Sequence, residues 1–373
     1  MPAIRSVTAR TVVIPLDAPT SFSTRQVTHR HYTLVRVETD DGASGIGFCY
    51  AGSAGGVLPS TAVRHLLAPR LVGEDPLRVE GLWQEVYAET LLHGRAGSVM
   101  RAISAVDTAL WDRNARAAGL PLHLHLGAVR TGTVPAYASG GYYLDGKGPE
   151  QLADEMRGYL GMGFRAVKMK IGRLDAAADA ERLAAVREAV GPDVLVMLDA
   201  NNAWRDLPTA LRAMALWEPH DPFWIEEPFS PDDIENHARL AERTPVIVAT
   251  GEIEAGRWRH QQLLDAGAAA ILQTDAAVCG GVSEFRRIAA AADSRGVTMY
   301  PHWFHDLHAP LVAATPNARM VEFFPDDKVL NFRRLLDRQL EVRDGELVLH
   351  EGPGLGFDFD DETVERYAAD GWE

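Results

Sequence analysis

The sequence has few cysteines, no long apolar run and no excess of positive charge, and each absence excludes a class of protein. Its two cysteines, Cys49 and Cys279, provide no disulfide framework and suit a reducing cytoplasm. No stretch is apolar over the length needed to cross a bilayer. The net charge of −15 argues against nucleic-acid or anionic-membrane partners, because phosphate groups are bound by basic surfaces. We therefore expect a cytoplasmic protein whose partner is a small molecule.

The 373 residues are otherwise of ordinary composition, 46% hydrophobic and 24% charged, and suffice for one large domain and a smaller one. Alternating apolar and polar residues at 33–38 lead into an Asp-Asp-Gly turn, which indicates a strand. A helical pattern follows at 104–118 and ends at Gly119. These patterns predict that residues 1–130 form an α+β domain.

Residues 131–325 change to a repeating pattern of short β-branched apolar runs and amphipathic stretches of helical length. Seven such helical stretches separate eight candidate strands, at 134–139, 166–170, 194–199, 223–226, 246–252, 270–275, 298–302 and 319–323. This order predicts an α/β fold, a modified TIM barrel of the (β/α)7β type. The alternative is an open doubly wound sheet, which needs a glycine-rich phosphate turn that is not found. Residues 326–373 lose the pattern and are expected to return to the first region.

Charged residues stand at the ends of the predicted barrel strands. In a barrel these C-terminal strand ends face one pocket, and seven successive strands end in Lys168 and Lys170, Asp199, Glu226, Glu252, Asp275, His302 and Glu322. Such regularity is typical of an active site rather than of solvated strand ends. The carboxylates of Asp199, Glu226 and Glu252 come from consecutive strands and would repel without a cation. Hard oxygen ligands favour Mg²⁺ over Zn²⁺, which prefers histidine and cysteine.

The other charged strand ends suit proton transfer. Lys168 and Lys170 share one face of their strand, and two neighbouring ammonium groups lower each other's pKa, so that a lysine becomes a usable base. His302 and Asp275 end neighbouring strands, where the carboxylate would fix the imidazole tautomer and raise its basicity. Glu322 is a candidate protonated acid that donates to a developing oxyanion. The alternatives without catalysis are that Lys168 and Lys170 form a solvated lysine pair and that His302 is a hydrogen-bonded core histidine.

Taken together, these residues resemble the mandelate racemase subgroup of the enolase superfamily over essentially the whole chain. The matching motifs are AVDTALWD at 105–112, VKMKIG at 167–172, DAN at 199–201, WIEEP at 224–228, GE at 251–252, QTD at 273–275, GGV at 280–282 and PGLG at 353–356, with His302 and Glu322. Thr274 departs from the proline that is common there. The resemblance implies an α+β capping domain, formed by both chain ends, over the barrel.

The resemblance also implies roles for the residues. One Mg²⁺ per active site would be held by Asp199, Glu226 and Glu252. Lys170 would be the base on one face of the substrate, and His302 with Asp275 the acid or base on the other. Lys168 would bind the substrate carboxylate and Glu322 would hydrogen-bond its other oxygen. Two further residues, Asn201 and Glu227, would support the ligands from behind.

Specificity is expected to come from the cap, through lid loops near 21–31 and 51–56. The residues expected to bind the distal part of the substrate, through its hydroxyls or a second carboxylate, are Arg25, His29 and Arg30. Those expected to line the pocket from the barrel loops are Tyr142, Trp303 and His305.

The implied chemistry is removal of the proton next to a carboxylate to give an enediolate. We expect a lyase, an acid-sugar dehydratase that forms a 2-oxo-3-deoxy acid in carbohydrate acid catabolism; a racemase, epimerase or cycloisomerase is the alternative. A non-catalytic binding barrel would have lost a metal ligand or a base, and a metal-dependent hydrolase is disfavoured by the all-carboxylate ligand set. The chain is expected to form a homo-oligomer.

Overall fold

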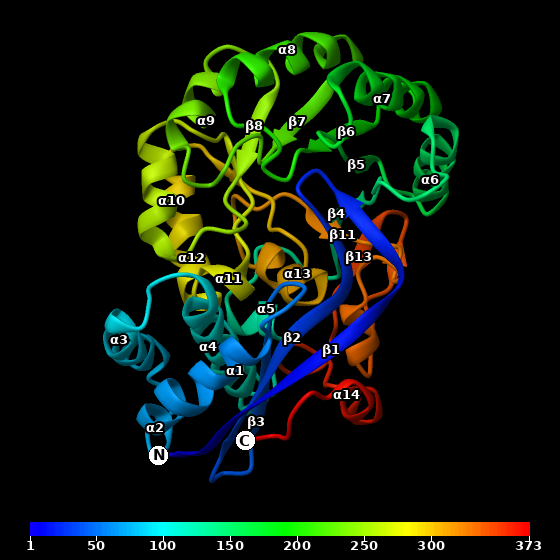
Figure 1. Cartoon of the computed structure of the whole chain (residues 1–373). Coiled ribbons are helices and arrows are strands. Elements are labelled where there is room, and N and C mark those ends of the chain that lie inside the picture. The colour runs from blue at the N-terminus through cyan, green and yellow to red at the C-terminus, as the bar shows by residue number, and fades with distance from the viewer.

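The computed structural model describes residues 1–373 and contains a closed barrel with helices around it (Figure 1). Its eight strands are β4 (Thr133–Ser139), β5 (Ala166–Lys170), β6 (Leu195–Asp199), β7 (Pro222–Glu226), β8 (Ile247–Thr250), β9 (Ile271–Leu272), β10 (Thr298–Met299) and β11 (Val321–Phe323). Parallel pairing runs in chain order from β4 to β10, and β11 pairs with β4. A bridge between Met299 and Ala318 closes the ring. The predicted barrel is confirmed.

Helices fill the seven connections between these strands: α6 (Pro149–Gly161), α7 (Ala176–Val190), α8 (Leu207–Trp217), α9 (Ile234–Ala241), α10 (Gly256–Asp265), the pair α11 (Ala276–Cys279) and α12 (Gly281–Asp293), and α13 (His305–Ala313). Local sequence sets several of their ends. Asp175, Asp206 and Asp233 each accept a backbone N–H in the first turn of α7, α8 or α9. Gly191, at a φ of 81°, ends α7 in the left-handed region that glycine tolerates.

The later barrel strands are shorter than predicted, so three of the charged residues lie beyond them. Glu252, Asp275 and His302 stand in the loops that follow β8, β9 and β10. Gly251, at a φ of 115°, turns the chain out of β8. Asp275 is the N-cap of α11 and accepts the N–H of Ala277. The predicted strand ends at these positions are therefore corrected to loop residues.

The cap packs helices on a three-stranded antiparallel sheet, β1 (Ile4–Phe22), β2 (Arg25–Thr39) and β3 (Ser44–Tyr50). Its helices are α1 (Val57–Ala62), α2 (Ala68–Leu71), α3 (Val79–Glu89), α4 (Gly97–Ala117) and α5 (Leu122–His125). Two glycines of β3, Gly45 and Gly47, let α4 approach, because a Cβ at either would overlap the carbonyl of Ala109 or Ala105. Among the helices of the protein, none combines the length and apolar character of a membrane-spanning segment.

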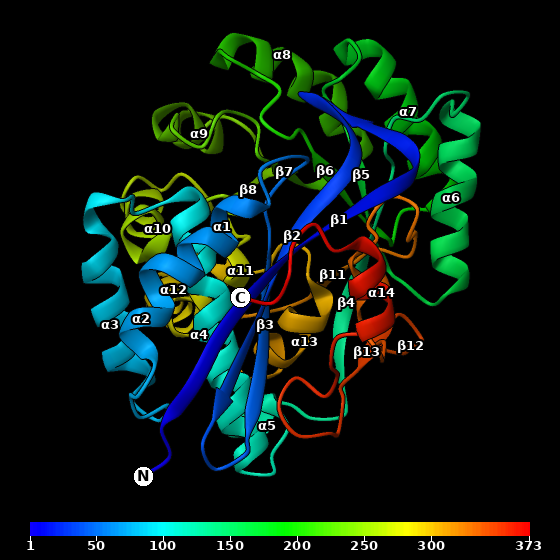
Figure 2. The same cartoon turned by 60° about the horizontal axis from the view of Figure 1, so that its bottom comes forward.

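The first predicted lid loop is the tip of the β1–β2 hairpin. Residues 21–31 are paired in these strands except for Ser23 and Thr24. The hairpin extends from the cap across the end of the barrel (Figure 2). There the Oγ of Ser23 donates to the carbonyl of Ala200 at 2.5 Å. The second predicted lid segment, 51–56, is a loop between β3 and α1.

The C-terminal segment contacts both parts of the fold. β12 (Val342–Arg343) and β13 (Glu346–Val348) form a hairpin, and β13 pairs antiparallel with barrel strand β4. The chain then passes through α14 (Asp361–Tyr367) to β1, where Ala369 N donates to the carbonyl of Thr11 at 2.9 Å. Both chain ends therefore meet in the cap, as predicted, but the tail first extends the barrel sheet.

Candidate active site

Three charged residues stand in register at the C-terminal ends of neighbouring strands. Lys170, Asp199 and Glu226 are the last residues of β5, β6 and β7. Strand pairing sets Lys170 against Asp199, and Asp199 against Glu226. The parallel register therefore brings together at one end of the barrel residues that are far apart in the sequence.

Lys168 is the centre of a buried ion cluster. Its Nζ lies 2.8 Å from each carboxylate oxygen of Glu226, 2.6 Å from Oε1 of Glu322 and 3.5 Å from Oδ2 of Asp199. Lys170 forms an ion pair with Asp199. Burial lowers the pKa of both lysines, but the carboxylates outweigh burial and raise it above its usual value. The lowered lysine pKa that the sequence led us to expect is therefore absent from this arrangement.

Glu322 differs from the protonated acid that we expected. Its Oε2 accepts the backbone N–H of Trp303 at 2.7 Å, and its Oε1 contacts Lys168. Burial raises the pKa of Glu322, but Lys168 and His302 outweigh burial, so the pKa lies below its usual value. Glu322 is therefore an ionised acceptor that orients Lys168 and the backbone after His302.

The cluster holds more negative than positive charge. Glu226 and Glu227 are fully buried, and burial raises the pKa of each well above its usual value. The neighbouring carboxylates of Asp199 and Glu252 raise both values further. Several buried carboxylates around only two ammonium groups are unfavourable unless another cation is bound.

Unpaired oxygen atoms indicate where such a cation fits. Oε2 of Glu252, Oε1 of Glu227 and the Oδ1 atoms of Asn201 and Asn202 are buried and accept no hydrogen bond. All four residues line the same cavity. A set of oxygen donors of this kind fits Mg²⁺. No three acidic or histidine side chains are gathered into one ligand shell; instead, Asp199 and Glu226 are paired with the lysines.

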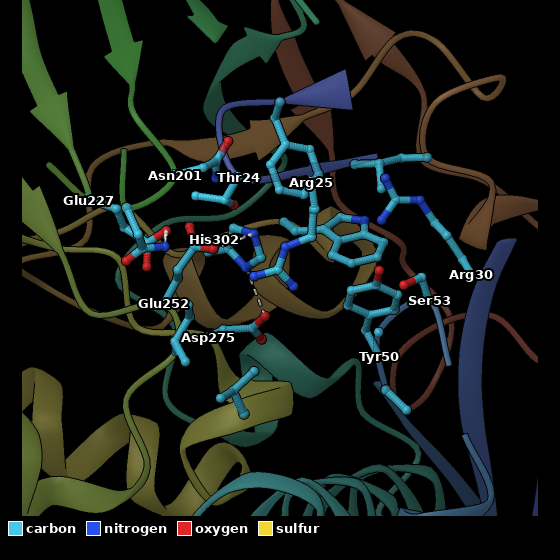
Figure 3. A pocket seen from close by; sticks show the side chains of 18 of the residues that line it. Thr24, Arg25, Arg30, Tyr50, Ser53, Asn201, Glu227, Glu252, Asp275 and His302 are labelled. Atoms are coloured by element: carbon cyan, nitrogen blue, oxygen red, sulfur yellow. Dashed lines mark hydrogen bonds and ion pairs between the residues drawn. The ribbon is translucent and has the colours of Figure 1, made fainter. Parts of the chain in front are cut away.

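His302 and Asp275 form the predicted pair. His302 Nδ1 lies 3.0 Å from Asp275 Oδ2, and its Nε2 lies 3.5 Å from Glu252 Oε1 (Figure 3). Burial lowers the pKa of His302, but Glu252 and Asp275 outweigh burial and raise it to about 9. Asp275 is held from behind, because its Oδ1 accepts the N–H of Ala277 at 2.8 Å. The pairing fixes Nδ1 as the donor and leaves Nε2 for proton transfer.

A cavity of about 230 Å³ is lined by residues of both the cap and the barrel. Lys170 and His302 both line it, one from β5 and the other from the loop after β10. Four of the residues that line it have left-handed backbones, Asn201 at a φ of 42°, Asn202 at 63°, Glu227 at 42° and Trp303 at 48°. Such conformations cost about 1–3 kcal/mol each and are concentrated at functional sites.

The substrate-binding residues expected from the cap and loops are only partly brought together. Those that line the cavity are Arg25, Arg30, Tyr142 and Trp303. His29 is exposed on β2 and contacts Thr28, because the inward position belongs to its neighbour Arg30. His305 is buried at the start of α13 against the ring of Phe323. The assignments of His29 and His305 to the pocket are corrected.

The sequence analysis missed three residues that line the cavity, namely Tyr50, Arg101 and Asn202. Thr24 and Ser53, which also line it, lie in the two predicted lid loops but were not singled out there. Asn202 could have been found as the neighbour of Asn201, in the same loop after β6. Arg101 carried no local signal, because it is one arginine on the amphipathic helix α4, far from the barrel in sequence. Its Nη1 donates to the carbonyl of Tyr50 at 3.0 Å.

Two domain families match the sequence. The N-terminal domain of mandelate racemase/muconate lactonizing enzymes matches residues 4–127, and the enolase C-terminal domain-like family matches residues 151–363. An arabinonate dehydratase from Saccharolobus solfataricus is 35% identical over 89% of each chain. An L-talarate/galactarate dehydratase from Salmonella typhimurium is 35% identical over 92% of this chain and 86% of the relative. A D-galactarolactone cycloisomerase from Agrobacterium fabrum is 33% identical over 94% of this chain and 95% of the relative.

Solved structures are similar to the whole fold. A racemase from Streptomyces coelicolor with bound magnesium superposes with a TM-score of 0.92 at 32% identity, over 98% of this chain and 100% of that one. An L-talarate dehydratase from a Polaromonas species, complexed with Mg and L-glucarate, has a TM-score of 0.91 at 33% identity, over 99% and 98%. The likeness therefore covers the cap as well as the barrel.

Proposed function

This chain belongs to the mandelate racemase/muconate lactonizing enzyme family of the enolase superfamily, and we propose that it is a Mg²⁺-dependent dehydratase of an acid sugar. One arrangement carries the proposal: Lys170 and His302 reach a single cavity from different sides of the barrel, beside buried carboxylate oxygens. Two such groups suit removal of the proton from C2 and delivery of a proton to the hydroxyl group that leaves C3. The dehydratases among the relatives support loss of water as the outcome.

Lys170 would begin the reaction. Its Nζ would take the proton from C2, and the electron pair would pass into the adjacent carboxylate to form an enediolate. Lys170 can act as a base when Asp199 is engaged elsewhere, because Asp199 raises the pKa of this ammonium. A ligand role for Asp199 meets that condition. Asp199, Glu226 and Glu252 would hold the Mg²⁺, which would supply positive charge beside the carboxylate of the substrate.

His302 would complete it. The electron pair of the enediolate forms the C2–C3 double bond as the C3–O bond breaks, and Nε2 of His302 gives its proton to the departing hydroxide. Asp275 stabilises the imidazolium through the Nδ1 contact. Lys168, which is buried beside Glu226, would bind an oxygen of the substrate carboxylate. Glu322, as an ionised acceptor, would hold the Lys168 ammonium in place and would not itself bind the carboxylate. The enol product then takes up a proton at C3 and becomes the 2-oxo-3-deoxy acid.

Proton NMR in D₂O tests the proposal with the Mg²⁺-loaded enzyme and a panel of sugar acids. The expected result is a 2-oxo-3-deoxy acid with deuterium at C3. Deuterium at C2 with epimerisation, and no 2-oxo product, would replace the dehydratase by an epimerase.

A cycloisomerase is the second candidate, because one relative of similar length is named as a lactone cycloisomerase. The same two proton-transfer groups would serve, with a ring oxygen rather than hydroxide as the leaving group. Including sugar-acid lactones in the NMR panel separates the two, since a cycloisomerase gives a ring-opened isomer without loss of water.

A further inference from the structure

The two sides of the cavity differ in charge. Its barrel side carries the acidic residues and their lysine and histidine partners, whereas three arginines, Arg25, Arg30 and Arg101, line it from the cap. None of the three forms an ion pair with an acidic side chain of this chain. Their polar contacts are hydrogen bonds to backbone carbonyls, from Arg30 Nε to Val329 at 2.9 Å and from Arg101 Nη1 to Tyr50 at 3.0 Å.

Arg30 provides a fixed positive charge. Only 4% of its surface is exposed, and its guanidinium lies 5.4 Å from the ring centres of both Tyr50 and Trp303. A guanidinium cannot lose its proton to relieve burial. A buried charge without an acidic partner is costly unless a counter-ion is bound beside it.

Arg101 and Arg25 offer free donors to such an anion. Arg101 is half-buried on α4 and uses one N–H on Tyr50, so most of its five donors remain unpaired. Arg25 is the first residue of β2, and its guanidinium lies 5.7 Å from the ring of Phe22, a contact that uses none of its N–H donors. Figure 3 shows its side chain reaching into the cavity, with Arg30 and Tyr50 farther toward the cap.

We infer that the cap side of this cavity binds a second carboxylate, so that the substrate is a dicarboxylic acid sugar with an acid group at each end of its carbon chain. The inference rests on the proposed function, which places the first carboxylate at the barrel side. Arg101 and Arg25 bind the distal carboxylate through the flat, forked arrangement of their N–H groups, which matches two carboxylate oxygens. Arg30 contributes charge and closes the cavity.

A neutral end group fits less well. A hydroxymethyl group would accept one or two hydrogen bonds and leave three positive charges without an anion. A terminal phosphate is also an anion that arginines bind, so the first experiment below includes a phosphorylated acid. A carboxylate is favoured over the larger phosphate because the cavity has a volume of only about 230 Å³. Its cap side is also bounded by aromatic rings and Leu330.

The first experiment compares matched acids. Each hexarate is paired with the hexonate of the same configuration at C2 to C5, for example galactarate with galactonate, and with the corresponding 6-phosphohexonate. Turnover is measured as kcat/KM with the Mg²⁺-loaded enzyme. Affinity is measured separately by calorimetry on Mg²⁺-loaded Lys170→Ala, which does not consume the acid. We expect the best hexarate to exceed its hexonate by about 10- to 100-fold in both quantities, the usual weight of a charge-assisted hydrogen bond.

The second experiment removes the cap charge. Arg101→Met should reduce the hexarate-to-hexonate ratio about 10-fold or more, and Arg101→Lys should restore part of it. Arg25→Met should reduce the ratio in the same direction. Arg165→Gln is the matched control, because Arg165 is an exposed arginine just before β5, at the opposite end of the barrel. It should leave both the ratio and the rate unchanged.

The outcomes separate this inference from the proposed function. Turnover with equal values for hexarate and hexonate, or a preference for the 6-phosphate, overturns the inference and leaves the dehydratase standing. Failure of every acid to bind overturns the inference. Tighter binding of hexarates that depends on Arg101, without any exchange at C2, supports the inference and overturns the dehydratase.

Discussion

The carboxylate of Asp107 accepts two hydrogen bonds from Ser283, one from the backbone N–H at 2.9 Å and one from Oγ at 2.6 Å. Asp107 lies on cap helix α4 and Ser283 in the first turn of barrel helix α12, so this pair joins the two parts of the chain. Gly281 allows the contact, because a Cβ there would overlap the Asp107 carboxylate. The short helix before it, α11, is capped by Asp275, so the junction supports the segment that carries the partner of His302.

This junction should make stability depend on pH. Burial raises the pKa of Asp107 from 3.8 to about 7. The folded state therefore binds this proton more tightly than the unfolded state, and the contribution of Asp107 to stability is greatest below pH 4 and declines as the pH rises to 7. The free-energy difference between wild type and Asp107→Asn in urea unfolding should shift by a few kcal/mol between these limits, at ~1.4 kcal/mol per pKa unit. Asp232→Asn, at an exposed position, should show no such shift. A difference for Asp107→Asn that did not change with pH would contradict the expectation.

Removal of the metal should abolish turnover and lower the Tm. After exhaustive EDTA treatment the buried carboxylates lack the positive charge of the metal, which destabilises the folded state. Added Mg²⁺ should restore both turnover and Tm, because it binds the folded state. Glu252→Gln should lose the response of rate and Tm to Mg²⁺ while keeping the fold. Glu188→Gln, on the exposed face of α7, is the control and should respond like wild type. Full turnover after EDTA treatment would refute metal dependence.

The two proton-transfer groups should be distinguishable by exchange. Lys170→Ala and His302→Asn should each lower kcat by about 10²- to 10⁴-fold, the usual contribution of a general acid or base. His302→Asn should still exchange the C2 proton with D₂O through Lys170, while it forms the 2-oxo acid only at this reduced rate. His29→Asn, on the exposed side of β2, should behave as wild type. If both site variants kept wild-type rates, the assignment would be wrong.

Replacement of Gly47 by alanine should destabilise the close contact between α4 and β3, whereas the same change at Gly158, which makes no such contact, should not. In Gly47→Ala the new methyl group overlaps the carbonyl of Ala105, and such overpacking costs about 1–3 kcal/mol or more. Gly158→Ala lies on α6 with no atom within 4 Å of the new Cβ, and it should stabilise the helix by about 0.5–1 kcal/mol. Thermal unfolding followed by circular dichroism measures both. A loss of Tm in Gly158→Ala equal to that in Gly47→Ala would contradict the contact.

The barrel and the line of charged groups at its mouth could be predicted from sequence. Strand length, the two-residue alternation of side chains and the rule that C-terminal strand ends share one face are all local properties. They sufficed to place Lys170, Asp199 and Glu226 side by side, and to pair His302 with Asp275. Even where the later strands are short and Glu252 lies in a loop, the chain order around the barrel still delivers it to the same cavity.

Tertiary packing alone decided which cap residues reach that cavity and what charge the buried groups carry. Arg30 faces inward and His29 outward because of the register of β2 on its neighbours, and Arg101 arrives through the packing of α4 on the glycines of β3. The raised pKa of Lys168 depends on carboxylates from β7 and β11 that are adjacent only in the closed barrel. In each case the deciding partner is remote in sequence, and the burial and distance that set the interaction exist only after the chain has folded.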